Sequence, residues 1–299
     1  MRLAENKVTS KFDYNRAFSR NLGWFNEIEQ EKIRTAVIAI PGMGGVGGHH
    51  LHSLLRVGFS RFKIADFDYF DVHNFNRQIG ANVNTVGMDK CEVMRDLALS
   101  INPESQVEIF QSGVTKENAQ DFLKGVDIVI DSLDIYQIDM RIVLYDLAHD
   151  KKIPVLTAAP LGMGTSILCF NPDKLSFTNY FNINENLSDE DKLARMLAGV
   201  APKALHLKYL YYKKFIKFSE GQVPSLHMGC LAATSALSSA CTKIILNRGS
   251  MIYAPSGYQV DFYRNKMKKF WRPFGNKNPI QKLIILYIKF SMRRTDRKK

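Results

Sequence analysis

The sequence predicts an α/β fold, in which a doubly wound, mostly parallel sheet carries helices on both faces and is followed by a basic C-terminal extension. Two observations predict it. Short β-branched apolar runs alternate with helical patterns between residues 35 and 170, and such alternation is typical of parallel strands joined by crossover helices. In addition, the glycine-rich stretch "GMGGVGG" joins the first apolar run to the helix that follows it.

The elements follow in order from the hydrophobic pattern. The run "VDIVIDSLD" is nearly continuous and is typical of a strand buried on both faces, and the helix that begins at Lys90 is expected to stop before Pro103. Strands are predicted at 35–40, 61–68, 106–110, 126–134, 153–160 and 165–170. Helices are predicted at 28–33, 50–57, 90–101, 117–123, 138–149 and, with many small residues, 226–246.

Composition excludes several classes of protein. No apolar run approaches the roughly 20 residues of a membrane-spanning helix, and the first residues lack the apolar region of a signal peptide, so we expect a cytoplasmic protein. The four cysteines form no CxxC pair, which argues against a disulfide framework and a cysteine-rich zinc site. The formal net charge of +12 belongs to residues 264–299, which hold thirteen basic residues and one acid.

The glycine run predicts a Rossmann-like nucleotide site. Gly42, Gly44 and Gly47 fit the G-x-G-x-x-G pattern directly after a strand and at the start of a helix. They would allow a tight turn, a close approach of phosphate and close helix packing, with the helix N-terminus facing an anion. Asp66 and Asp68 end the next strand, where a ribose-binding acid is expected. This pattern alone fits a dinucleotide as well as ATP, and a turn that serves only packing remains an alternative.

The next segment favours ATP. Asn74, Arg77 and Gln78 follow the acids, and Lys90 comes thirteen residues after Arg77. Phosphoryl chemistry on a triphosphate requires positive groups that stabilise the developing charge and the leaving pyrophosphate. A nicotinamide dinucleotide gives this arginine and lysine no role, so an oxidoreductase is disfavoured.

These ordered motifs resemble a known family, the ThiF, MoeB and HesA adenylyltransferases, which are relatives of the ubiquitin-activating enzymes. The matching stretches are GMGGVGG, DFD, NFNRQ, GMDK and DSLD, which ends at Asp134. "FSRNLG", "NFNRQIGA" and "TAAPLGMGTSILCFNP" further resemble a ThiF-like group sometimes joined to nitroreductase-like domains. The resemblance covers residues 18–172 well and 224–261 loosely.

The resemblance implies a role for each matching residue. The nucleotide would contact Gly42, Gly44, Gly45, Gly47, Asp66, Asp68 and Asp131, with Asp66 on the ribose hydroxyls. Arg77 and Lys90 would hold the phosphates, which Asn74 and Gln78 would position. Asp134 would coordinate Mg²⁺, a hard cation suited to carboxylate and phosphate oxygens. A simple helix-capping role remains the alternative for Asp131 and Asp134.

The resemblance also implies a homodimer. Arg20 lies where the family often places an arginine that reaches into the partner subunit's site, and Arg16 is a competing alignment. The organisation we expect is a helical segment at 1–34, a nucleotide-binding half at 35–172, a crossover and substrate-side half at 173–262, and a basic amphipathic tail at 263–299.

The implied reaction is attack of a carboxylate on the α-phosphorus of ATP, which releases pyrophosphate and leaves an acyl-adenylate. The expected substrate is the C-terminus of a small ubiquitin-like protein or peptide. An RNA-linked carboxylate, as in relatives that modify tRNA, and a nucleotide-binding scaffold without catalysis are the alternatives. Positioning and electrostatics suffice for the first step, with no protein nucleophile.

The sequence departs from the family in three places. It lacks the two CxxC pairs that bind structural zinc in many relatives, so no zinc is expected. Residues 171–229 contain no cysteine that could form a thioester, and Cys169 and Cys230 are expected to be ordinary buried thiols. Ile135 stands where relatives usually have asparagine.

Two further stretches carry weaker signals. In "HHLH", His49, His50 and His52 point in different directions on a helix, so a metal site is disfavoured and a surface or phosphate-neighbouring position is expected. In the tail, a basic amphipathic helix is predicted. RNA, an anionic membrane surface, an acidic partner and docking on its own domain are the alternatives for it. Its cationic side would hold Lys282, Lys289 and Arg293, and its apolar side Leu283, Ile284, Tyr287 and Ile288.

Overall fold

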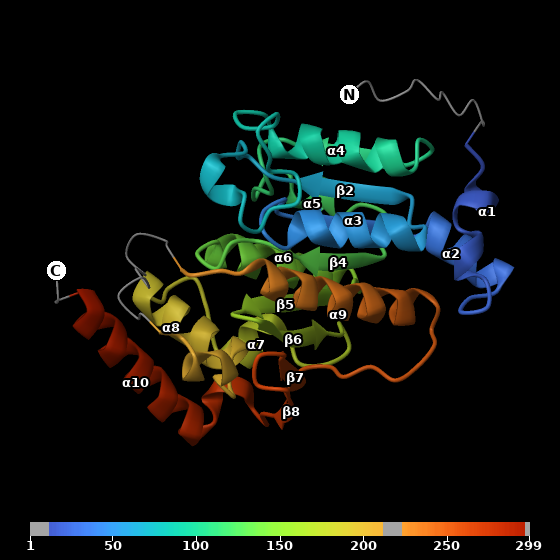
Figure 1. Cartoon of the computed structure of the whole chain (residues 1–299). Helices are drawn as coiled ribbons and strands as arrows, with labels where there is room; N and C mark the ends of the chain where they lie inside the picture. Colours follow the sequence, from blue (N-terminus) through green and yellow to red (C-terminus); the bar gives the residue numbers. More distant parts are fainter. Residues whose placement is uncertain (1–11, 212–222, 297–299) are drawn as a thin grey trace.

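The computed structural model describes residues 12–211 and 223–296, which form one eight-stranded sheet with helices on both faces (Figure 1). The strand order is β3-β2-β1-β4-β5-β6-β7-β8. The first five strands in that order are mutually parallel, and β6, β7 and β8 continue the sheet in antiparallel fashion. The strands are β1 (Val37–Pro41), β2 (Arg61–Ala65), β3 (Gln106–Phe110), β4 (Ile128–Asp131), β5 (Val155–Leu161), β6 (Gly164–Phe170), β7 (Ser256–Asp261) and β8 (Lys266–Trp271). The predicted α/β class, with a mostly parallel sheet and helices on both faces, is confirmed.

The helices connect and cover these strands. The α-helices are α1 (Tyr14–Ala17), α2 (Glu27–Thr35), α3 (Gly47–Val57), α4 (Lys90–Ile101), α5 (Ala119–Phe122), α6 (Ile138–Asp150), α7 (Phe177–Phe181), α8 (Asp189–Val200), α9 (His227–Ile245) and α10 (Pro279–Asp296). Short 3₁₀ turns are η1 (Ser19–Asn21), η2 (Val72–Asn74), η3 (Leu205–Lys208) and η6 (Gly275–Lys277). The predicted bounds of β3 and α4 agree with the structure residue for residue.

The sheet separates two hydrophobic cores. One contains side chains from α6, α7, α8 and α10, and the other contains side chains from α3, α4 and α9. Within the described residues, α9 is long and apolar enough to cross a membrane, but half of that stretch is buried. It packs against β5 and β6, where Gly229 lies so close that a Cβ would press on the Gly162 carbonyl. This is the position of a core helix.

Two strands, β7 and β8, were not predicted from the sequence. In β7, buried residues alternate with half-buried ones, and in β8 every residue except Phe270 is exposed, so neither strand forms an apolar run. Both strands join the sheet by pairing after β6. The segment from residue 263 onward therefore begins inside the sheet and leaves it only at η6.

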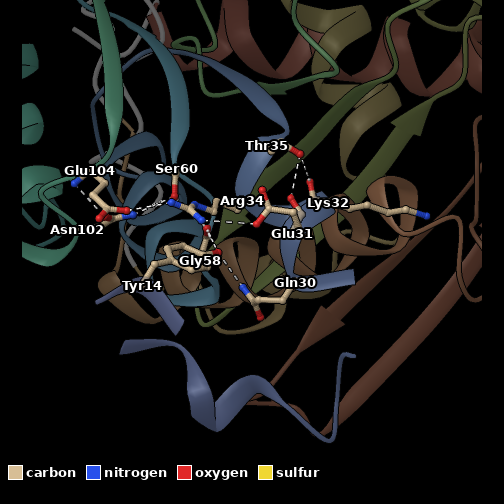
Figure 2. A network of polar contacts seen from close by, with 10 residues as sticks. All are labelled: Tyr14, Gln30, Glu31, Lys32, Arg34, Thr35, Gly58, Ser60, Asn102 and Glu104. Carbon is tan, nitrogen blue, oxygen red and sulfur yellow. Dashed lines mark hydrogen bonds and ion pairs between the residues drawn. The ribbon is translucent and has the colours of Figure 1, made fainter. Parts of the chain in front are cut away.

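The N-terminal segment is fixed at the end of α3. The Tyr14 hydroxyl donates to the carbonyl of Gly58, 2.7 Å away, and Gln30 Nε2 donates to that hydroxyl at 3.0 Å (Figure 2). Gly58 has a φ of +106°, and a Cβ there would overlap the Gln30 amide. Beside this contact, Asn102 Nδ2 donates to Ser60 Oγ at 2.9 Å. The network holds α1 and α2 against the C-terminal end of α3.

The tail forms the predicted helix, but with a different orientation. Ile284 and Ile288 pack against the core, whereas Leu283 and Tyr287 are exposed. The expectation of one apolar side containing all four residues is therefore wrong. The reason is that α10 has apolar residues on two opposite sides, and only one of them docks.

Candidate active site

The candidate site lies where the order of the parallel strands reverses. β1 has β2 on one side and β4 on the other, and the carboxyl ends of strands at such a reversal form the usual ligand-binding crevice of doubly wound folds. Here these ends lead into the glycine turn after β1, the acids after β2 and the loop after β4. The topology therefore gathers three of the predicted motifs at one edge.

Two glycines of the turn are required by packing. Gly42 has a φ of +96° and donates its N–H to the Ala65 carbonyl at 2.6 Å, and a Cβ there would overlap the Ser132 carbonyl oxygen. A Cβ on Gly47 would overlap the Gly42 carbonyl oxygen. The glycine turn is thus in close contact with the start of α3 on one side and with the loop after β4 on the other.

Two other glycines leave open space. At Gly44 the nearest atom to an added Cβ is Gln78 Nε2, 3.9 Å away, and at Gly45 the nearest atoms, at 3.5 Å, belong to Arg77 and Cys230. No protein atom therefore requires glycine there. The turn is open on the side of Arg77 and Gln78, at the N-terminus of α3, where backbone N–H groups attract anions.

The acids after β2 are tied into the same edge. Asp66 accepts the N–H groups of Met43 at 2.6 Å and Asp68 at 2.9 Å, which anchors the glycine turn to β2, and burial raises the pKa of the Asp66 carboxyl. The carboxylate of Asp68 lies 2.7 Å from Lys90 Nζ. Lys90 is buried at the first turn of α4 while Asp68 is half exposed, so the ion pair aims the buried ammonium toward the surface of this edge.

The segment after these acids forms a tight turn around Asn74. Asn74 Oδ1 accepts the Asp71 N–H at 3.0 Å, and its carbonyl accepts the N–H groups of Arg77 and Gln78. Arg77 is half-buried and donates to the His73 carbonyl and to Asn76 Oδ1, each at 3.1 Å. Gln78 is 6 % exposed, and its Oε1 is buried without a hydrogen-bond partner in the described part of the chain. An unpartnered buried carbonyl beside an open glycine turn suits a ligand that donates a hydrogen bond.

Asp131 lies in a buried ionic network. Its carboxylate accepts from Arg141 Nε at 2.7 Å and from the Tyr145 hydroxyl at 2.9 Å, and all three side chains are buried. Arg141 also donates to the carbonyls of Leu133, at 2.6 Å, and Asp134, at 3.2 Å. Asp131 therefore acts through Arg141 on the loop that carries Asp134. Sequence reasoning missed Arg141 and Tyr145, although their i, i+4 spacing on an otherwise apolar helix face was the available signal.

Asp134 is the exposed acid of this loop. Its Oδ1 accepts the Tyr136 N–H at 3.0 Å, which leaves the second oxygen available to a ligand. No group of three His, Cys, Asp or Glu side chains able to hold a metal occurs within residues 12–211 and 223–296. One carboxylate fits Mg²⁺ that takes its remaining oxygen ligands from phosphate and water, as Mg²⁺ usually does in nucleotide sites.

Three further residues, His49, His227 and Cys230, lie near Arg77 and Gly45, and of these His227 and Cys230 were not expected at the site. His49 Nε2 lies 3.0 Å from the Arg77 carbonyl, and its ring lies tilted against that of His227 with centroids 4.9 Å apart. Cys230 is fully buried beside Gly45, and burial raises the pKa of its thiol. The N-termini of α3 and α9 therefore meet here. Of the two positions expected for His49 and His50, the surface position is wrong, because both rings are buried where α3 packs on α9 and the sheet. The position next to the phosphates stays a prediction.

Arg20 is not brought to this edge. It is exposed on η1, whose Asn21 donates to the Val57 carbonyl at the far end of α3, and α3 with eleven residues spans about 16 Å. Arg16 lies at the same end and is also exposed. Within one chain, neither arginine belongs to the glycine turn.

The fold and this edge can now be set beside known proteins. The model of the ThiF family matches residues 18–280. The chain belongs to the ThiF family. The matched segment includes the glycine turn and α9 and ends at the start of α10.

Three relatives show how far the likeness of this ThiF-family chain extends. It is 36 % identical over 132 residues to the tRNA threonylcarbamoyladenosine dehydratase of Haemophilus influenzae, which covers 44 % of this chain and 50 % of the relative. The Escherichia coli dehydratase TcdA in complex with AMP has a similar fold, with a TM-score of 0.57, 21 % identity and coverage of 78 % and 95 % of the two chains. MccB of Escherichia coli with MccA has a TM-score of 0.65, 17 % identity and coverage of 90 % and 75 %.

Thus the chain spans about half the length of this curated relative, and the two solved structures establish the fold.

Proposed function

We propose that this ThiF-family chain is an ATP-dependent adenylyltransferase that activates a carboxylate as an acyl-adenylate. The observation that carries the proposal is the meeting of the open glycine turn with Arg77, Gln78 and the Asp134 loop at one edge of the sheet. Curated relatives of this chain include a probable molybdopterin-synthase adenylyltransferase of Porphyra purpurea, 34 % identical over 105 residues.

In the proposed reaction, a carboxylate oxygen attacks the α-phosphorus of ATP and the bond to pyrophosphate breaks. The N-terminus of α3 and the open side of the turn at Gly44 would receive the phosphates. Arg77 and Lys90 would stabilise the negative charge on the leaving pyrophosphate. Mg²⁺ bound by Asp134 would neutralise phosphate charge, while the Arg141 network keeps the Asp134 loop in place.

The substrate we propose is the C-terminus of a small ubiquitin-like protein or of a peptide. The shared fold with MccB, whose structure was solved together with MccA, supports a polypeptide substrate. A second candidate is an RNA-linked carboxylate, which the 36 % identity to a tRNA threonylcarbamoyladenosine dehydratase favours.

Pyrophosphate exchange into ATP tests the activity. Exchange should require Mg²⁺ and a candidate carboxylate, and should fall at least about 100-fold in Arg77→Ala and Asp134→Ala, because each would remove charge stabilisation of the reacting phosphates. Lys152→Ala, which removes an exposed cation paired with Asp173 away from this edge, is the matched control. A nucleotide-binding scaffold would bind ATP without exchange, and exchange unaffected by both site variants would contradict the proposal. Stimulation by tRNA but not by peptides would select the second candidate.

We further propose a homodimer in which Arg20 acts on the partner's site. Arg20 lies at the end of α3 opposite the glycine turn, so it would serve a site only across an interface. Mixing inactive Arg20→Ala with inactive Asp134→Ala should restore part of the exchange activity, because each mixed dimer would hold one intact site. Arg16→Ala in place of Arg20→Ala distinguishes the two arginines. No recovery with either arginine variant would contradict action in trans.

A further inference from the structure

The outward side of α10 presents an apolar surface to solvent. Its five large side chains are each between 61 and 71 % exposed. Their spacing along the helix places them on one side. They are Ile280, Leu283, Leu286, Tyr287 and Phe290, which we call the α10 apolar face.

The opposite side of α10 fixes this orientation. Ile285 and Met292 are buried in the core beneath α8. Lys289 Nζ lies 2.7 Å from the Asp191 carboxylate, and Arg293 makes a bidentate contact with Glu190 at 2.7 and 3.0 Å. Rotating the helix to bury the α10 apolar face would break both ion pairs and expose the docked side. The outward apolar face is thus a property of the packed helix.

The extent of this exposed apolar surface indicates that it binds another molecule or a membrane. Five large side chains that are each more than 60 % exposed lie together on one side of this helix, and extended apolar patches of this kind on a protein surface mark protein or membrane interaction sites. Figure 1 shows α10 along an outer side of the molecule, packed beside α8 and, at its start, near η6. The side chains of the α10 apolar face therefore lie on the outside of the described fold.

Charge decides which partner fits. Residues 264–299 carry thirteen basic residues and one acid. In α10, Lys289 and Arg293 are paired with α8, whereas Lys282 is exposed beside the α10 apolar face. A second copy would bring another strongly positive segment against this one, which is unfavourable. RNA would pair with the cations but would leave the aliphatic side chains exposed to water. An anionic bilayer satisfies both, because apolar and aromatic side chains insert at the level of the headgroups while lysine and arginine meet anionic lipids.

We propose that α10 docks this protein on anionic lipid membranes through the α10 apolar face. The helix would lie in the plane of the interface, with Leu283, Tyr287 and Phe290 inserted and Lys282 at the headgroups. The α8 contacts would hold the rest of the molecule above the surface. The proposal is independent of the adenylation proposed above, because it uses no residue of the candidate active site.

Co-sedimentation with vesicles of phosphatidylcholine alone and of phosphatidylcholine mixed with phosphatidylglycerol tests the proposal. The full chain should bind the mixed vesicles at least about tenfold more tightly, and added salt should weaken this binding. The double variant Leu283→Ser with Tyr287→Ser should lose it. Trp24→Ser is the matched control, because Trp24 is 80 % exposed at the α2 end of the molecule.

Circular dichroism of the double variant should match that of the unaltered chain, since both side chains point into solvent. Equal binding of the double variant and the unaltered chain would overturn the proposal, as would no binding to the mixed vesicles. Without lipid, a dimer that the double variant abolishes would show that a second copy covers this face, which also overturns the proposal. Preference for single-stranded RNA over the mixed vesicles, lost in the double variant, would overturn it too.

Discussion

The five parallel strands β3-β2-β1-β4-β5 and the three antiparallel strands β6-β7-β8 share one sheet, but their polar side chains are used differently. At the carboxyl ends of the parallel strands, Asp66 and Asp131 are held by backbone N–H groups and by the buried Arg141. Beyond the antiparallel strands, the ion pairs of α10 with α8 lie near the surface. We infer that the stability of the first region depends on close packing and buried charge, whereas the second region tolerates substitutions. The following variants test this difference.

The largest effect is expected in the glycine turn. Gly47→Ala should destabilise the protein by about 3 kcal/mol or more, because the new Cβ would overlap the Gly42 carbonyl. Gly44→Ala should change the free energy of unfolding by less than about 1 kcal/mol, since its Cβ meets only open space, but should weaken ATP binding. Denaturant unfolding and ATP titration measure the two effects. Equal destabilisation by both variants would show that the turn is not under the packing constraint described here.

The buried ionic network should come next. Arg141→Met leaves the Asp131 carboxylate buried without its ion-pair partner, which should cost about 3–5 kcal/mol of unfolding free energy. Tyr145→Phe removes one hydrogen bond to the same carboxylate and should cost about 1–3 kcal/mol. Chemical denaturation compares them. A smaller loss in Arg141→Met than in Tyr145→Phe would contradict the central position given to the arginine.

A pH dependence is expected from His50 beside the glycine turn. Burial lowers the pKa of its ring to about 3, so between pH 6.5 and 3 the unfolded chain binds a proton that the folded chain does not. Stability contributed by this group is complete above pH 6.5 and falls by about 1.4 kcal/mol per pH unit as the pH decreases through that window. His50→Leu should flatten the difference between unfolding at pH 7 and pH 5. An unchanged difference would show that His50 is not the group responsible.

The smallest effect is expected at the far side of the sheet. Lys289→Ala removes an ion pair that keeps contact with water, and such pairs contribute less than about 1 kcal/mol. Thermal unfolding at low and high salt measures the loss, which salt should reduce. A loss as large as that of Arg141→Met would abolish the distinction drawn between the two regions.

The difference between the parallel and the antiparallel region also explains how much of the fold and of the candidate site the sequence predicts. In the parallel region each strand is a compact apolar run, and the motif residues come directly after the carboxyl ends of these strands. Their positions in the sequence therefore predict that they lie together at that edge of the sheet. Asp131 shows the limit of that reasoning. Its partner Arg141 comes from the next helix, and only the packing of α6 brings the two side chains together.

In the antiparallel region the sequence predicts less. β7 and β8 lack apolar runs because alternate residues of β7 are only half-buried and most of β8 is exposed. The register of β7 depends on β6, more than 80 residues away along the chain, and β8 joins the sheet through β7. For α10, the pattern predicts a helix with apolar residues, but which apolar side docks depends on its packing beside α8, where Ile285 and Met292 are buried and both cations meet acids of α8. The same acids also determine where the two cations point.

Among the residues that the structure describes, β8 is the last strand of the sheet, and its outer edge pairs with no further strand. An open strand edge can template pairing with another molecule, and natural proteins often oppose this with lysine. Lys266, Lys268 and Lys269 occupy half of this six-residue strand. Two molecules approaching edge to edge would bring these ammonium groups together, so at low ionic strength the chain resists sheet-to-sheet aggregation, and concentrated salt removes that protection.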